Sequence, residues 1–256
     1  MREDFYAEYY EVEGRHWWFR GRARIVTAII ASLGLPASAR ILDYGTGTGA
    51  MLAELRRFGD ARGVDADERA VAFCHARGER RVSRLDSDAL PFADASFDLV
   101  TALDVLEHIG DDRAALGEIA RVLKPGGRLL ATVPANPWMW GAQDEVSHHF
   151  RRYTQATLRT AIGDGGLELE RLTHFNTLLF PPIAAIRLLR RLRPSADEPR
   201  SDFQTTGGEG ALGRLLAGVF GLEARWLARA GLPFGVSLLA VARAPDAADQ
   251  APAPLK

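Results

Sequence analysis

The sequence predicts an α/β fold with a doubly wound, parallel sheet, and three observations carry this prediction. An apolar strand-like run at 41–44 leads through glycines at alternate positions into a helix-forming run at 50–57. Further strand-like and helix-like segments then alternate along the chain, which is typical of parallel strands joined by right-handed crossovers. The 256 residues are 47% hydrophobic and 25% charged, which is enough apolar material for a full core.

Composition and charge exclude several classes of protein. The formal net charge is −1, so no global electrostatic attraction to nucleic acid exists, and we expect no nucleic-acid partner. The single cysteine, Cys74, excludes an intramolecular disulfide framework and a cysteine-rich metal site. The N-terminus has no apolar signal-like segment, and the most apolar later stretch, 178–189, is too short to cross a bilayer. We therefore expect a cytoplasmic protein.

The N-terminal part, residues 1–36, is expected to be helical. Apolar side chains recur at helical spacing through 17–33, and the Gly-Leu-Pro sequence at 34–36 ends the pattern. This helix begins with the aromatic run 17–19. Either the helix simply packs on the sheet, or its aromatic residues form a lid over the site opened by the glycines.

Strands and helices alternate through the rest of the chain, and we expect one domain over residues 1–244. The predicted strands are 41–44, a short strand ending at 65, 82–86, 97–103, 128–133, 167–172 and 235–243. The predicted helices are 50–57, 67–77, 111–123, 154–162 and 212–230. Within the domain, 37–175 form the ligand-binding core, 176–233 a helical insertion and 234–244 the last strand. The Ala/Pro/Asp-rich tail, 245–256, is predicted to be disordered.

The turn after the first strand carries Gly45, Gly47 and Gly49, which indicate a ligand lying against the backbone. The helix behind the turn offers unpaired N–H groups and a partial positive charge. Asp65 follows at the end of the second strand, where its carboxylate can accept hydrogen bonds from ribose hydroxyls. These features predict a nucleoside-containing ligand, and at this step a nicotinamide dinucleotide fits as well as any other.

Motifs further along the chain narrow the choice among nucleoside-containing ligands. Together with Asp43 and the glycine turn, their order resembles the class I S-adenosylmethionine-dependent methyltransferases of the broad type 11/12 small-molecule kind, over about residues 38–175. The motifs are Asp86-Ser87-Asp88-Ala89-Leu90-Pro91-Phe92, Phe97-Asp98-Leu99-Val100, Leu103-Asp104-Val105-Leu106-Glu107-His108-Ile109 and Leu123-Lys124-Pro125-Gly126-Gly127-Arg128-Leu129.

The resemblance implies a Rossmann-like, doubly wound sheet of seven strands in which the last strand is antiparallel. Residues 235–243 are the candidate for that strand. In this family a short hairpin usually joins the last two strands, whereas here the long segment 175–233 lies between them. The role of this segment stays open at the level of the sequence.

The resemblance also implies S-adenosyl-L-methionine as the cofactor and assigns residues around the glycine turn to it. The backbone at Gly45, Gly47 and Gly49 would approach the methionine and ribose parts of the cofactor. Asp43 would belong to the same cradle, and Asp65 would hold the ribose hydroxyls.

Residues after the third and fourth strands complete the implied cofactor site. Asp86 would accept the adenine amino group, and Ser87 would offer its backbone N–H to the ring. Asp88 is the near alternative to Asp86, because it also follows the third strand. Leu103 and Asp104 would line the methionine side.

Methyl transfer from a sulfonium needs alignment of the acceptor and exclusion of water, and a base only if the acceptor must lose a proton. The loop 134–153 follows the fifth strand at the edge where ligands bind in such sheets. We expect His149 to be the general base, with His148 and Tyr153 as the next candidates. Alternatively, His149 and Arg152 brace the loop, Tyr153 caps it, and catalysis is purely positional.

No metal is predicted, because no His, Cys or Asp residues have zinc-like spacing. Glu107 and His108 are expected to stabilise the turn after the fourth strand. The Arg151–Arg152 pair either binds an acidic acceptor or is simply solvated.

The acceptor is expected to be a small molecule or a lipid- or sugar-linked compound. The segment 178–193 joins an apolar face to several arginines, which suits a peripheral membrane contact, a cover over the substrate pocket, or a dimer contact. Two other functions stay open. One is an NAD(P)-dependent oxidoreductase, although the sequence offers no Tyr-x-x-x-Lys pair. The other is a non-catalytic partner protein that binds S-adenosylmethionine.

Overall fold

The centre of the sheet forms from strands that are mostly apolar and buried on both faces, namely β1, β4 and β7, whereas the edge strands β3 and β6 are partly exposed. In the computed structural model, which describes residues 5–192 and 210–246, seven strands pair in the order β3-β2-β1-β4-β5-β7-β6. β7 pairs antiparallel with both β5 and β6, while β1 to β5 are mutually parallel. The strands are β1 Arg40–Tyr44, β2 Asp60–Asp65, β3 Val82–Arg84, β4 Phe97–Leu103, β5 Leu123–Pro134, β6 Glu168–Phe175 and β7 Ser237–Arg243. The predicted fold class, including the antiparallel last strand, is therefore confirmed.

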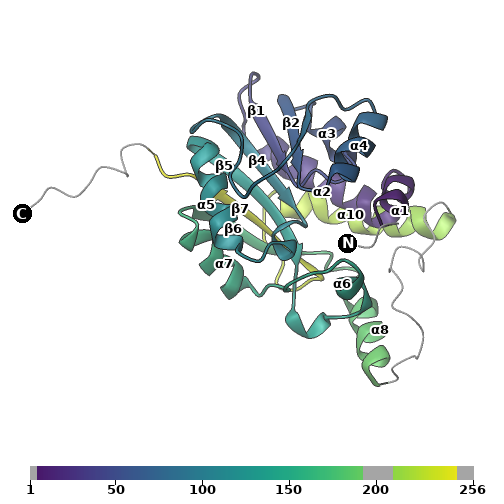
Figure 1. Ribbon diagram of the computed structural model, residues 1–256. Coiled ribbons are helices and arrows are strands. Elements are labelled where there is room, and N and C mark those ends of the chain that lie inside the picture. The colour runs from purple at the N-terminus through teal and green to yellow at the C-terminus, as the bar shows by residue number, and fades with distance from the viewer. Residues whose placement is uncertain (1–4, 193–209, 247–256) are drawn as a thin grey trace, which may run out of the picture.

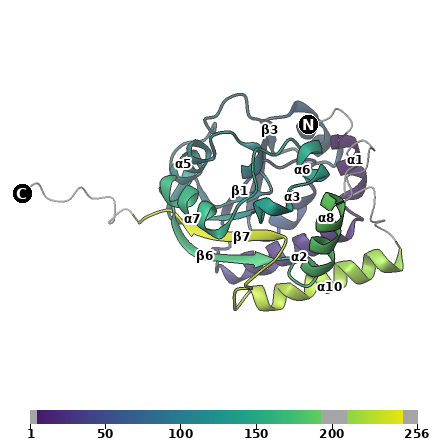
Figure 2. The same ribbon diagram turned by 90° about the horizontal axis from the view of Figure 1, so that it is seen from below.

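Helices cover both faces of the sheet (Figures 1 and 2). Helices α2, α3, α4 and α10 bury apolar side chains against one face, and α5 and α7 bury theirs against the other. The helices are α1 Phe5–Val12, α2 Trp17–Ser32, α3 Ala50–Leu55, α4 Glu68–Ala76, α5 Asp112–Val122, α6 Ala142–Val146, α7 Gln155–Asp164, α8 Phe180–Leu192 and α10 Ala211–Leu227. Two short 3₁₀ turns are η1 Leu106–His108 and η2 Pro137–Met139.

Two element boundaries differ from the predictions. β3 ends at Arg84, so Asp86 lies beyond the strand rather than at its end. β5 begins at Leu123, before the Pro-Gly-Gly sequence, instead of at Arg128. The pairing with β4 shifts register here, and Gly126 has a φ of +71°, so the expected tight turn is accommodated as a bulge within a strand.

The long segment between β6 and β7 contains α8 and α10, as the predicted helical insertion requires. α10 lies along α2, and the ring of Phe220 packs where Gly21 leaves room for it. α8 lies next to α6 and η2, on the side of the molecule away from α5 (Figure 1). Residues 193–209 lie outside the described residues. Of the tail 245–256, which was predicted to be disordered, only residues 245–246 are described. None of the described helices is long and apolar enough to cross a membrane.

Candidate cofactor and acceptor site

A cavity of about 1000 Å³ lies at the carboxyl ends of the central strands. Its wall combines the glycine turn and η1 with residues from α1, α2, the loop 134–153 and α8. A volume of this size is large enough for a nucleoside-containing ligand together with a small second molecule. This is the edge of a doubly wound sheet at which ligands bind.

The three glycines of the turn have left-handed backbone angles, but for different reasons. Gly45 and Gly47 line the cavity. A Cβ on Gly45 would overlap Val105, whereas a Cβ on Gly47 would meet no atom within 4 Å. Gly49 is the N-cap of α3, and a Cβ there would come 2.9 Å from the Sγ of Cys74. Gly47 thus leaves open space beside the backbone, as a cofactor cradle requires, while Gly49 serves helix packing and does not line the cavity.

Asp43 lies beneath the turn and does not line the cavity. Its carboxylate accepts hydrogen bonds from the hydroxyls of Thr46 at 2.9 Å and Thr101 at 2.6 Å. Burial raises the pKa of Asp43, and these two hydrogen bonds oppose the rise. In this structure, Asp43 therefore ties the glycine turn to β4.

Asp65 lies beside the turn, on the cavity wall. Its Oδ2 accepts a hydrogen bond from the backbone N–H of Gly47 at 2.8 Å, and its Oδ1 accepts one from Asp67 at 2.9 Å. Burial raises the pKa of Asp65 to about 6. The carboxylate is thus held at the position expected for a group that accepts ribose hydroxyls.

Leu103 and Asp104 line the cavity where β4 ends. Asp104 has a φ of +59°, and its Oδ2 accepts hydrogen bonds from Arg22 Nη1 at 2.5 Å and from Thr132 at 3.1 Å. The guanidinium of Arg22 also lies 4.6 Å from the ring centre of Trp18. This buried ion pair joins the N-terminal helix α2 to the sheet beside the methionine side of the expected site.

Asp86 and Ser87 are not among the residues that line the cavity. Asp86 is exposed and pairs with Arg84 Nε at 3.1 Å, and the Ser87 hydroxyl donates to Ala89 at 3.2 Å. The neighbouring Leu85 does line the cavity. Recognition of adenine by Asp86 and Ser87 stays a prediction, because neither side chain faces the cavity in this structure.

His149 lines the cavity and is held by a buried carboxylate. Asp144 Oδ1 lies 2.9 Å from Nδ1 of His149 and accepts a hydrogen bond from Arg152 Nε at 2.8 Å. Burial raises the pKa of Asp144, but the contacts with His149 and Arg152 outweigh it and hold that pKa below its usual value. An ionised Asp144 makes Nδ1 of His149 the hydrogen-bond donor and leaves Nε2 as the basic nitrogen. This arrangement of His149 agrees both with a role in bracing the loop and with a role as an oriented general base.

The other two candidate bases differ in position. His148 lines the cavity with a φ of +55°. Tyr153 is buried and is not among the cavity-lining residues; its hydroxyl donates to Asp112 at 2.6 Å and lies 3.3 Å from the carbonyl oxygen of Leu106. Tyr153 therefore connects the loop to α5 and η1, as the alternative of a loop cap expects.

Several cavity residues were not predicted from the sequence. Glu13 reaches the glycine turn, where its carboxylate accepts a hydrogen bond from Thr48 and pairs with Arg77 at 3.3 Å. Burial raises the pKa of Glu13. Glu107 and His108, expected only to stabilise a turn, also line the cavity. These placements depend on contacts between segments far apart in the chain, and no local pattern indicates them.

Trp17 and Trp18 line the cavity, and so do Ile183, Ile186 and Arg187 of α8. The N-terminal helices and α8 thus both contribute to its wall. This arrangement agrees with a lid formed by the aromatic residues at 17–19 and with a cover over the substrate pocket formed by 178–193.

Comparison with known proteins agrees with the motifs. Residues 42–131 match the model of a family described as a methyltransferase domain. Over 109 residues the chain is 40% identical to a demethylmenaquinone methyltransferase of Mycolicibacterium paratuberculosis, covering 42% of this chain and 46% of that protein. It is 29% identical over 151 residues to a ubiquinone biosynthesis O-methyltransferase of Maricaulis maris, covering 51% and 59%. The matched region therefore spans about half the length of these relatives.

Among solved structures, the chain is similar to one from the complex between the Haloferax volcanii Trm112 methyltransferase activator and a candidate methyltransferase. The TM-score is 0.61 at 24% identity, covering 96% of this chain and 99% of that one, which is a likeness of fold. The glycine turn with Gly47 open to the cavity and Asp65 beside it fits a nucleoside cofactor. By its motifs, its sheet order and the match over residues 42–131, the chain carries a methyltransferase domain of the class I kind, whose cofactor is S-adenosylmethionine.

Proposed function

We propose that this protein transfers the methyl group of S-adenosylmethionine to a small-molecule acceptor bound in the same cavity. One observation carries the proposal: the glycine turn and Asp65 line a cavity that continues to His149 and to α8. Cofactor and acceptor can therefore meet in one cavity, and alignment of a methyl transfer requires such proximity. When bound, the cofactor supplies an electrophilic methyl group with its own leaving group.

The wall of the cavity favours an acceptor with an apolar body. Trp17, Trp18, Ile183 and Ile186 supply apolar surface, and Arg187 supplies a cationic group. The names of the two relatives concern menaquinone and ubiquinone, and we propose a ring compound of comparable chemistry, including a lipid-linked one.

A sugar-linked acceptor has no comparable support in this wall. Arg152 lines the cavity, but it is paired with Asp144 at 2.8 Å, and Arg151 is paired with Asp112 at 3.0 Å. The Arg151–Arg152 pair therefore gives weaker support to an acidic acceptor.

A peripheral membrane contact through 178–193 would suit a lipid-linked acceptor. Leu188 and Leu189 of α8 are exposed, which supports this part of the proposal. Arg193 of this segment lies outside the described residues.

His149 is our candidate for the general base. Its Nδ1 is held by Asp144 and its ring lines the cavity, so Nε2 is available to an acceptor hydroxyl. A positioned base contributes about 10²- to 10⁴-fold to such a step.

The experiment is single-turnover transfer of a labelled methyl group from S-adenosylmethionine to a panel of demethylated quinols, followed across pH. We expect transfer by the wild-type protein and a loss of about 100-fold or more in His149→Ala, with the largest loss where the acceptor is protonated. An unchanged rate in His149→Ala at every pH would exclude the base. Binding of the cofactor without transfer to any acceptor would favour the non-catalytic partner protein instead.

A further inference from the structure

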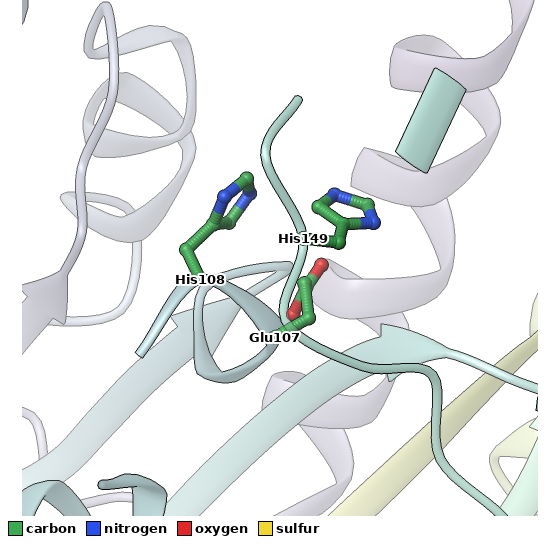
Figure 3. A group of neighbouring side chains, drawn as sticks. All are labelled: Glu107, His108 and His149. Atoms are coloured by element: carbon green, nitrogen blue, oxygen red, sulfur yellow. The ribbon is translucent and has the colours of Figure 1, made fainter. Parts of the chain in front are cut away.

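A carboxylate and two imidazoles meet on the wall of the cavity. Glu107 and His108 lie in η1, directly after β4, and His149 comes from the loop after α6. The potential ligand atoms of these three residues all lie within 4.8 Å of one another. In Figure 3 the Glu107 carboxylate points toward the two rings. We call these residues the Glu107 cluster.

Glu107 is the unusual member of the cluster. The residue is 1% exposed, and its Oε2 has no hydrogen-bond partner among the described residues. An unpartnered buried carboxylate is costly unless a cation or a donor compensates it. The environment of Glu107 thus calls for a positively charged partner.

The two imidazoles lie beside this carboxylate as potential ligands. The rings of His108 and His149 lie edge to face, 4.6 Å between centres. Asp144 holds Nδ1 of His149 at 2.9 Å, which leaves Nε2 to act as a ligand. A carboxylate behind a histidine is the usual outer support of a metal-bound imidazole.

We propose that Glu107, His108 and His149 bind one divalent transition-metal ion of the zinc type. Two imidazoles and one carboxylate suit such ions and leave a coordination position open. In a tetrahedral site, ligand atoms about 2 Å from the ion lie about 3.3 Å from one another, so the side chains need to close by up to about 1.5 Å. The sequence predicted no metal because the ligands come from two separate segments, and the proposal departs from that prediction.

The site deepens the proposed function and in this respect rests on it. An acceptor hydroxyl at the open position would be acidified by the ion and would release its proton to solvent. The oxygen lone pair then forms the C–O bond to the methyl group, while the C–S bond breaks and its electron pair stays on sulfur. In this arrangement His149 is a metal ligand, and the ion takes over the task of the general base.

The test is titration of the full-length, chelator-treated protein with Co²⁺, followed by visible absorption, and with Zn²⁺ by calorimetry. We expect one site per chain in the wild-type protein. Glu107→Gln and His149→Ala should each weaken binding by about tenfold or more. His148→Asn is the matched control: it removes a neighbouring histidine outside the cluster, asparagine tolerates the φ of +55°, and binding should not change.

Absence of Co²⁺ binding by the folded wild-type protein, or wild-type affinity for Co²⁺ in either Glu107→Gln or His149→Ala, would overturn the inference. Binding of S-adenosylhomocysteine measured on the same samples separates the two proposals. Methyl transfer that proceeds fully in the presence of a chelator would refute the metal site and leave the proposed function standing. Metal binding by a protein that does not bind S-adenosylhomocysteine would support the metal site and refute the proposed function.

Discussion

At the scale of single residues, Asp65 shows how a predicted role depends on surroundings that the sequence does not reveal. Burial raises its carboxyl pKa, hydrogen bonds from Asp67 and Gly47 oppose the rise, and the charges of Asp67 and Asp43 add to it. Its position at the end of β2 was predicted from the short strand-like segment Gly63-Val64-Asp65. The value of about 6 arises from tertiary packing.

This pKa gives a pH dependence whose sign can be stated. Ribose hydroxyls donate to an ionised carboxylate, so affinity for S-adenosylhomocysteine should rise with pH up to about 6 and then level off. Below that pH it should fall by at most about tenfold per unit. Because the folded pKa lies above the unfolded value, the unliganded protein should lose part of its stability as pH rises from about 4 through 6.

Calorimetry between about pH 5 and pH 8 checks this dependence, and Asp65→Asn should abolish it. Affinity that stays constant over this range in the wild-type protein would show that Asp65 does not titrate on binding the cofactor.

At the scale of elements, strands and helices were largely predictable, whereas their ends and partners were not. β1 and β4 are mostly apolar and almost fully buried, so local composition is sufficient to identify them. β3 stops at Arg84 and β5 starts before its glycines, because pairing with neighbouring strands sets these limits. The contact of Glu13 with Thr48, like the meeting of His149 with Glu107, joins segments that no periodic pattern relates.

The docking of α10 on α2 gives a prediction at this scale. A Cβ at Gly21 would overlap the ring of Phe220, so Gly21→Ala should destabilise the protein by about 1–3 kcal/mol. Gly218→Ala is the matched control, since a Cβ there meets nothing within 4 Å and alanine favours a helix by about 1 kcal/mol over glycine.

Denaturant unfolding followed by fluorescence measures both variants. If Gly21→Ala were as stable as Gly218→Ala, α10 would not be packed on α2 as the structure has it.

At the scale of the whole molecule, the wall of the cavity is built from segments that lie far apart in the sequence. The glycine turn belongs to the predicted core, whereas the N-terminal helices and α8 come from outside it. The motifs identified the cofactor because they lie in the core. The acceptor is not encoded in any such motif, since its part of the wall is assembled from α2, α8 and the loop 134–153.

The central claim is that S-adenosylmethionine lies against the backbone of Gly47. Calorimetry with S-adenosylhomocysteine and with NADH, on the wild-type protein and on two glycine variants, tests it most directly. Gly47→Ala and Gly78→Ala share a left-handed backbone and an unobstructed Cβ, so both lose about 1 kcal/mol of stability to strain, but only Gly47 lines the cavity. We predict one S-adenosylhomocysteine per wild-type chain, no displacement by NADH, binding at least about tenfold weaker in Gly47→Ala, and unchanged binding in Gly78→Ala. Absence of binding by the wild-type protein, or equal affinity in the two variants, would contradict the account.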